Sequence, residues 1–159
     1  MEFRGVRCPV WMLPCPQTKG YNKHSFSMTP KAKILLIDDD LLVLRTLARA
    51  LNSRGYETAT VDSGPKAVER VKKEDFDLVM SDIRMPELDG VETADIIQEH
   101  CRRHGKSCAY LFITAYPDDR RAREITTSGR AKLLAKPFEI EELLELIGLE
   151  LQMRPGSSP

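Results

Sequence analysis

The sequence predicts an α/β fold in which a doubly wound sheet of five parallel strands carries helices on both faces. From residue 33 onward, short apolar runs alternate with longer segments whose apolar residues recur three or four positions apart. The short runs are mostly continuous, as expected of strands that are buried on both faces. The connections are short, and alternating strands and helices with right-handed crossovers favour a parallel, doubly wound sheet.

The first strand and helix have the clearest pattern. Residues 33–38 (KILLID) predict a buried strand, and residues 40–54 predict a helix with Gly55 just past its end as a C-cap. The apolar positions at helical spacing are Leu41, Leu44, Leu47, Ala48 and Leu51. Residues 56–61 (YETATV) are rich in β-branched side chains and predict the second strand.

The third strand lies between two further helices. Asp62 or Ser63 can cap the second helix, whose apolar positions are Ala67, Val68 and Val71. Residues 77–81 (DLVMS) predict the third strand, and the loop DIRMPELDG follows it. The third helix carries its apolar side chains at Val91, Ala94, Ile97 and Cys101.

The last two strands are separated by a short polar helix. Residues 108–114 (CAYLFIT) predict the fourth strand. Pro117 is expected at the start of a helix over residues 118–127, because proline is tolerated at the first helical position, and Gly129 ends that helix. Residues 131–135 predict the fifth strand. The last helix is predicted over residues 140–151, with Leu143, Leu144 and Ile147 inward.

Length and charge limit the protein class. The 159 residues suit one domain, and the 24 basic side chains equal the 24 acidic ones, so the overall charge does not indicate nucleic-acid binding. No apolar run approaches the roughly 20 residues of a membrane helix.

Residues 1–31 have a surplus of four positive charges, four prolines and no periodicity. We interpret them as a tail that is disordered or was introduced upstream of a natural start at Met28. The predicted domain is residues 32–152, followed by a disordered tail over residues 153–159.

The four cysteines do not predict a metal site. Cys8 and Cys15 lie in the first tail, and Cys101 and Cys108 flank a predicted loop between helix and strand. Neither pair has the spacing of zinc ligands. We therefore expect free thiols in a reducing cytoplasm.

Polar side chains collect at the carboxyl ends of the predicted strands. In chain order they are Asp38, Asp39, Asp40, Asp82, Thr114 and Lys136. These ends meet at one edge of a doubly wound sheet, where ligands bind. Two like charges about 4 Å apart repel by about 4 kcal/mol at an effective dielectric constant near 20. Lys136 offsets only one acid, so Asp38, Asp39 and Asp82 predict a site for Mg²⁺ or Mn²⁺. Asp40 is interpreted as a helix N-cap.

Four motifs in this pattern resemble a known family. ILLIDDD, MSDIRMPELDG, ITAY and LLAKPF occur in the order and spacing of response-regulator receiver domains of two-component signalling, over residues 32–152. The resemblance implies a flavodoxin-like sheet with strand order 2-1-3-4-5, as in chemotaxis regulators. It also implies that the Lys136–Pro137 bond is cis.

The resemblance implies a role for each site residue. Asp82 would accept a phosphoryl group from the phosphohistidine of a sensor histidine kinase or histidine phosphotransfer protein. Asp38, Asp39, Asp82 and the backbone carbonyl of Arg84 would hold Mg²⁺, and Thr114 and Lys136 would bind the phosphoryl oxygens. Such a domain is a phosphoacceptor switch, not a conventional enzyme.

One position departs from the family pattern. The family has an aromatic residue three positions before the site lysine, where this chain has Leu133. This departure motivates an alternative, a constitutive protein-interaction module that keeps the fold and does not switch. The complete set of site residues argues against it: Asp38, Asp39, Asp82, Thr114 and Lys136. A third hypothesis, an aspartate-nucleophile phosphohydrolase, requires a second acid two residues after the nucleophile, where Arg84 stands.

The output of the domain is open at this stage. No output domain follows Leu151, so we expect a cytoplasmic stand-alone receiver with a downstream protein target, or the amino-terminal part of a longer regulator. Arg120, Arg121 and Arg123 on the fourth helix suggest a solvated face, a partner surface or a homodimer contact, and they are too few to indicate DNA binding. Arg84 and Tyr116 are expected to flank the phosphoryl group and shield it from water.

Overall fold

The computed structural model describes residues 30–129 and 131–153, and most of both predicted tails lies outside these residues. The five strands are β1 (Lys33–Ile37), β2 (Glu57–Val61), β3 (Leu78–Asp82), β4 (Ala109–Thr114) and β5 (Lys132–Ala135). The helices are α1 (Leu41–Ser53), α2 (Gly64–Val71), α3 (Gly90–Arg103), α4 (Arg120–Ser128) and α5 (Ile140–Gln152). All strand pairs are parallel, in the order β2-β1-β3-β4-β5, so the predicted fold and strand order are confirmed.

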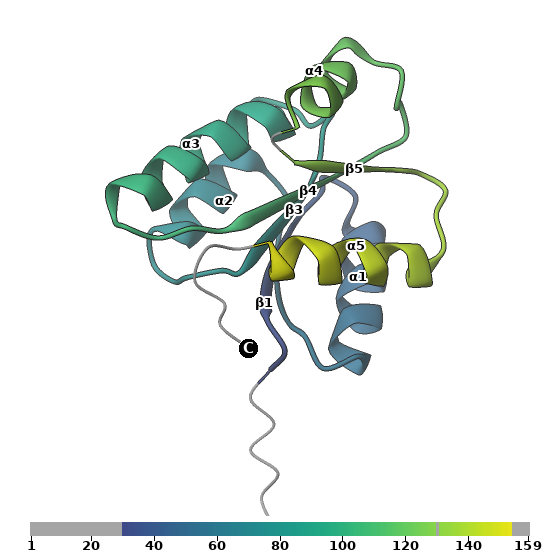
Figure 1. Ribbon diagram of the computed structural model, residues 1–159, viewed down its shortest axis with the longest axis horizontal. Helices are drawn as coiled ribbons and strands as arrows, with labels where there is room; N and C mark the ends of the chain where they lie inside the picture. Colours follow the sequence, from purple (N-terminus) through teal and green to yellow (C-terminus); the bar gives the residue numbers. More distant parts are fainter. Residues whose placement is uncertain (1–29, 130, 154–159) are drawn as a thin grey trace, which may run out of the picture.

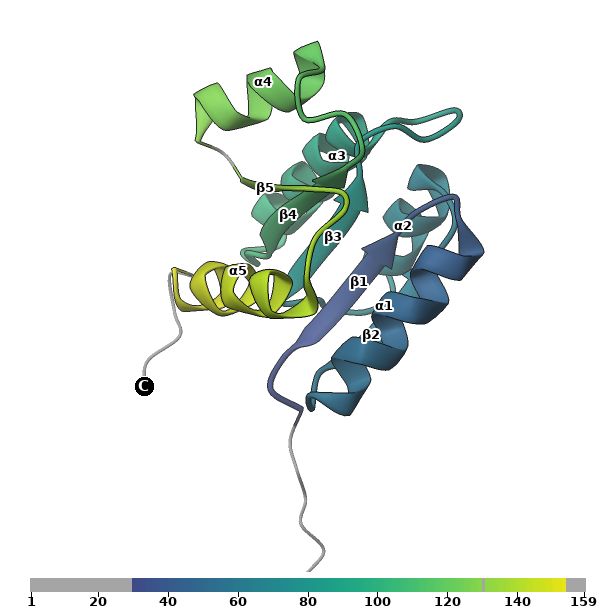
Figure 2. The same ribbon diagram turned by 90° about the vertical axis from the view of Figure 1, so that its right-hand side faces the viewer.

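The sheet separates two hydrophobic cores. Because side chains alternate along a strand, Leu35 and Ile37 of β1 face one core and Ile34 and Leu36 face the other. Helices α2, α3 and α4 contribute to the first core, and α1 and α5 to the second. Figures 1 and 2 show α1 and α5 on one face of the sheet and the other three helices on the opposite face. Within the described residues, no helix has the length and apolar character needed to cross a bilayer.

The helix caps explain several boundaries. The Asp40 carboxylate accepts a hydrogen bond from the backbone N–H of Leu42 at 2.8 Å, which confirms its predicted role as the N-cap of α1. Ser63 is the N-cap residue of α2 but makes no capping hydrogen bond with its side chain. Gly129 ends α4 in the left-handed conformation, with φ of 63°, a geometry that glycine adopts without steric cost.

The prediction for the start of α4 was wrong by two residues. Asp119 is the N-cap, and its carboxylate accepts a hydrogen bond from the backbone N–H of Arg121, so α4 begins at Arg120. Pro117 lies in the preceding turn, in which the Asp119 N–H bonds to the carbonyl oxygen of Tyr116. The aspartate cap determines this start because it satisfies a free N–H of the first turn. Leu41, the first residue of α1, was predicted on the apolar face of the helix but is 56% exposed.

Candidate functional site

Three carboxylates meet at the carboxyl edge of the sheet. Asp38 and Asp39 follow β1, and Asp82 is the last residue of β3, the strand beside β1, where the sequence had placed it just after the strand. One carboxylate oxygen from each lies within 4.8 Å of the others. Asp38 is buried, Asp39 is exposed and the Asp82 side chain is 14% exposed. The site is therefore an acidic recess that opens to solvent on the Asp39 side.

Lys136 supplies a positive charge to this recess. Its ammonium group lies 2.9 Å from the Asp38 Oδ2 atom and 3.9 Å from the Asp82 Oδ1 atom. The second oxygen of Asp38 accepts a hydrogen bond from the Asp40 N–H, so the backbone and Lys136 together fix this carboxylate. The Lys136–Pro137 bond is cis, as the resemblance implied.

Thr114 ends β4, the other neighbour of β3. The side chain is buried, and its hydroxyl oxygen accepts a hydrogen bond from the Tyr116 N–H at 3.0 Å. The backbone N–H of Lys136 bonds to the Thr114 carbonyl oxygen at 2.7 Å, which ties the end of β4 to the residue that follows β5. Thr114 and Lys136 are therefore held next to each other beside the acidic recess.

Burial and charge act on the Asp82 carboxyl together. Burial, assisted by the charge of Asp38, raises the pKa of Asp82 to about 6, although Lys136 acts in the opposite direction. At neutral pH most of this carboxyl is still ionised. A carboxylate that is partly desolvated and incompletely balanced can attract a cation and can act as a nucleophile.

The acidic cluster fits a divalent metal ion. Its three donors are hard carboxylate oxygens, and a single ammonium group cannot balance them, a combination that suits Mg²⁺ or Mn²⁺ with water in the remaining coordination positions. The fourth predicted ligand, the Arg84 carbonyl, lies in the loop just after Asp82 and stays a prediction. Among the described residues, this cluster is the only group of three or more acidic, histidine or cysteine side chains close enough to share an ion.

A family comparison identifies the chain. Residues 34–148 match the model of the response regulator receiver domain, which covers more than half of the sequence. This chain belongs to the receiver-domain family. The sheet order and the acidic cluster place the family's characteristic features on this chain, so the predicted family is confirmed.

Individual relatives support the assignment. The receiver domain is 35% identical over 121 residues to the response regulator receiver protein CpdR of Brucella abortus, covering 72% of this chain and 92% of CpdR. It is 37% identical over 127 residues to the response regulator protein FleR of Pseudomonas aeruginosa, covering 79% of this chain and 26% of FleR. The chain therefore spans about a quarter of that longer relative. The solved structure of chemotaxis protein CheY4 of Vibrio cholerae superimposes with a TM-score of 0.67 at 27% identity, covering 75% of this chain and 98% of CheY4.

Sequence reasoning missed a set of contacts that join the loop after Asp82 to α4. Arg84 donates to the Asp119 carboxylate from its Nε atom at 2.8 Å and lies against the Tyr116 ring, 4.1 Å from its centre. Arg84 also lowers the pKa of the Asp119 carboxyl. Arg121 of α4 pairs with Asp89, the N-cap of α3, at 3.1 Å. The Asp89 cap could have been read from the sequence, because Glu92 three residues later completes a capping box.

Gly90 was also missed, although it limits how closely α3 approaches Asp82. A Cβ atom at Gly90 would overlap the backbone carbonyl oxygen of Asp82 and crowd the Ser81 hydroxyl. The Gly90 N–H bonds to the Ile83 carbonyl oxygen at 2.9 Å. The start of α3 therefore packs directly on the backbone that presents Asp82, and only glycine fits there.

Leu133 takes the position that is aromatic in the family. It lies on β5 opposite Phe112 of β4, and its partly buried side chain packs against the core formed with α2, α3 and α4. The side chain has no ring and no hydroxyl group. The aromatic ring of the family pattern is therefore absent at this position.

Proposed function

We propose that this receiver domain accepts a phosphoryl group on Asp82 from the phosphohistidine of a histidine kinase or histidine phosphotransfer protein, and thereby switches a partner-binding surface. The observation that carries this proposal is the position of the Asp82 carboxylate, which lies within 4.8 Å of carboxylate oxygens of Asp38 and Asp39 and 3.9 Å from the Lys136 ammonium. Residues 32–152 are the proposed functional unit. The kinase would act in the cytoplasm, and the output would be a downstream protein or an output domain of a longer regulator.

In the proposed transfer, an oxygen of Asp82 attacks the phosphorus atom, and the electron pair of the breaking P–N bond returns to the imidazole of the donor. Mg²⁺ held by Asp38, Asp39, Asp82 and the Arg84 carbonyl would neutralise charge on the phosphoryl oxygens. The carboxylate must be ionised for the attack, and a pKa of about 6 leaves it so at neutral pH.

Thr114 and Lys136 are positioned to receive the new charge. A phosphoryl group adds roughly −1.5 to −2 charges and needs hydrogen-bond donors. The Thr114 hydroxyl oxygen already accepts a hydrogen bond from the Tyr116 N–H. The hydroxyl hydrogen is therefore free to donate a hydrogen bond to a phosphoryl oxygen. Lys136 can turn from Asp38 towards the phosphoryl group without leaving the recess, because it already lies 3.9 Å from Asp82.

The test is the intact mass of the full chain after incubation with Mg²⁺ and acetyl phosphate, a small phosphodonor. We expect one added phosphoryl group on the wild type, and none on Asp82→Asn or in the presence of EDTA. Asp40→Asn is a matched control, because it removes a neighbouring charge and keeps a residue that can cap α1. It should be modified like the wild type.

A second candidate function rests on Leu133. If the folded wild type stays unmodified with every donor tried while Mg²⁺ is bound, the phosphoacceptor proposal is wrong. The constitutive interaction module, which keeps the fold without switching, then becomes the better description.

A further inference from the structure

Two thiols lie in contact at the amino-terminal end of the strands, opposite to the end that carries Asp82. Cys101 lies in the last turns of α3, and Cys108 immediately precedes β4. Their sulfur atoms are 3.7 Å apart, which is van der Waals contact, and neither cysteine is in a disulfide. Since Cys108 lies at the amino end of β4 and Thr114 at its carboxyl end, the full length of β4 separates this pair from the phosphoacceptor site.

We propose that Cys101 and Cys108 form a redox modification site, which a small neutral peroxide converts into an intrachain disulfide. In the first step the Cys108 sulfur attacks hydrogen peroxide, the O–O bond breaks, and Cys108 becomes a sulfenic acid as one water leaves. In the second step the Cys101 sulfur attacks the Cys108 sulfur, the S–O bond breaks, and a second water leaves. Two thiols and one peroxide thus give one disulfide and two waters.

Accessibility assigns the order of these steps. Cys101 is only 7% exposed, whereas Cys108 is partly exposed. Both thiols line a cavity of about 290 Å³, which reaches solvent beside the loop between α3 and β4. Acidic and basic side chains, Asp75, Asp77 and Lys106, share the lining, so the cavity suits a small uncharged oxidant better than a bulky anion. The peroxide therefore meets Cys108, and Cys101 is the resolving thiol.

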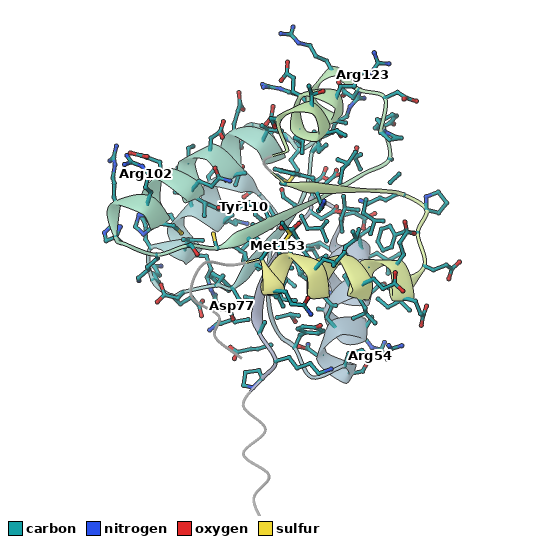
Figure 3. All side chains as sticks on the ribbon, viewed as in Figure 1. Arg54, Asp77, Arg102, Tyr110, Arg123 and Met153 are labelled. Atoms are coloured by element: carbon teal, nitrogen blue, oxygen red, sulfur yellow. The ribbon has the colours of Figure 1, made fainter. Side chains whose placement is uncertain are left out.

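Tyr110 supports the first step. Its hydroxyl oxygen lies 3.4 Å from the Cys108 sulfur, and its side chain is buried in the core that includes residues of α2, α3 and α4; Tyr110 is labelled in Figure 3. Burial raises the pKa of Tyr110, so the hydroxyl keeps its hydrogen when a thiolate forms nearby. It can therefore donate a hydrogen bond to the Cys108 thiolate, which is the reactive form of the side chain.

The backbone around the pair can close the remaining gap. A disulfide needs the sulfur atoms about 2.05 Å apart, so the two side chains must approach further. The connecting residues 102–107 are exposed, and Gly105 within them has a φ of 64° and open space around it. Arg102 projects outward from the end of α3 in Figure 3. Closure therefore moves a surface loop and leaves the sheet in place.

A zinc site at Cys101 and Cys108 is less well supported than the proposed disulfide. Zinc sites need three or four ligands, and among the described residues no third acidic, histidine or cysteine side chain joins these two sulfur atoms. A reversible disulfide is also compatible with thiols that are reduced at rest, since cytosolic disulfides are mostly transient and redox-sensing.

The experiment treats the reduced full chain with hydrogen peroxide, blocks the remaining thiols by alkylation and digests the chain with trypsin without reduction. Cleavage after Arg102, Arg103 and Lys106 separates Cys101 in peptide 85–102 from Cys108 in peptide 107–120. We expect these two peptides to be joined by a disulfide that dithiothreitol reverses. Cys8 and Cys15 fall together in peptide 8–19 and report non-specific oxidation in the same digest.

Single variants separate the two roles. In Cys101→Ser, Cys108 should accumulate as a sulfenic acid that dimedone traps, whereas the wild type should show little adduct. In Cys108→Ser, peroxide should consume Cys101 about tenfold more slowly than in the wild type, because the intramolecular partner is lost. The proposal is overturned if Cys101 and Cys108 stay alkylatable, if either links mainly to peptide 8–19, or if both oxidise at the same rates in the single variants.

Discussion

At Asp82, burial of a carboxyl group determines the pKa even though a lysine lies nearby. The pKa is about 6 in the folded protein, against about 3.9 for an unfolded chain. Between about pH 4 and pH 6 the folded state therefore holds a proton that the unfolded state has released. The free energy of unfolding must fall as the pH rises through this window, and the full cost, about 3 kcal/mol at most, is present above pH 6.

This cost predicts that Asp82→Asn stabilises the metal-free protein. With EDTA at pH 7, the free energy of unfolding should rise by about 1–3 kcal/mol, and the gain should shrink towards pH 4, where the wild-type carboxyl is protonated. Urea denaturation at several pH values measures both effects. Asp40→Asn, at the exposed cap of α1, serves as the control. Parallel pH profiles for Asp82→Asn and wild type would contradict the assignment of this proton to Asp82.

Gly90 provides a second prediction at the level of one residue. Gly90→Ala places a methyl group against the Asp82 carbonyl oxygen, so we expect a loss of about 1–3 kcal/mol of stability and slower modification by acetyl phosphate. Gly148→Ala is the matched control, because it lies within α5 and a Cβ there meets no atom within 4 Å. That variant should gain about 0.5–1 kcal/mol from helix propensity. Equal urea midpoints for the two variants would show that Gly90 does not constrain Asp82.

Among the structural elements, α4 is joined at its first turn by ion pairs to the loop after Asp82 and to the start of α3. Its first turn is held by Arg84 on Asp119 and by Arg121 on Asp89, two pairs whose acids also cap helices. Exposed ion pairs of this kind contribute little stability, at most about 1 kcal/mol each. They do, however, connect the loop that follows Asp82 to the start of α4.

Arg84 and Tyr116 are predicted to slow the loss of the phosphoryl group. Both side chains are about half exposed and stack on each other, two residues after Asp82 and Thr114, so together they can limit the access of water. Replacing both by alanine should speed hydrolysis of the phosphorylated protein several-fold, measured by the decay of its mass after the donor is removed. Arg123→Ala removes an exposed arginine that projects from α4 in Figure 3, and it should leave the rate unchanged. Equal rates in the double variant and wild type would exclude shielding.

The sequence predicted the elements better than their ends. Apolar periodicity located every strand and helix, because burial on both faces of the sheet leaves a strong pattern. It misplaced the start of α4, since Pro117 is a weaker signal there than the Asp119 cap. The site acids were predictable because strand ends converge in a parallel sheet. The Arg84–Asp119 pair and the contact of Cys101 with Cys108 were not, because each depends on how two separate segments approach each other in space.

At the scale of the whole molecule, the sheet divides the receiver domain into two packed halves. The proposed phosphoryl-binding groups end β3 and β4 and follow β5, and the core shared with α4 includes Phe112 and Leu133 on two of these strands. Because side chains alternate along β4, Thr114 lies on the same face as Phe112, which is the face covered by α2, α3 and α4. The surface around α4 is the one we expect to respond.

The energies limit how complete this response can be. Reversing a 1:99 equilibrium requires about 5.5 kcal/mol of differential binding. Two charge-assisted hydrogen bonds, from Thr114 and Lys136 to the phosphoryl group, contribute about 1.5–3 kcal/mol each, or about 3–6 kcal/mol together. The aromatic contribution of the family is missing at Leu133, so these two donors and the Arg84 contacts must supply the shift.

We therefore predict that phosphorylation changes amide hydrogen exchange over residues 114–128 and β5 and leaves α1 and α5 nearly unchanged. The comparison is between wild type and Asp82→Asn, each with Mg²⁺ and acetyl phosphate, with the phosphorylated fraction determined by mass in the same samples. Adding acetyl phosphate should change amide exchange only in the wild type, because only the wild type carries a phosphoryl group that Thr114 and Lys136 can contact. A fully phosphorylated wild type with unchanged exchange would mean that Leu133 has uncoupled the acceptor from α4. The domain would then accept phosphate without switching, and the constitutive interaction surface would be its remaining function.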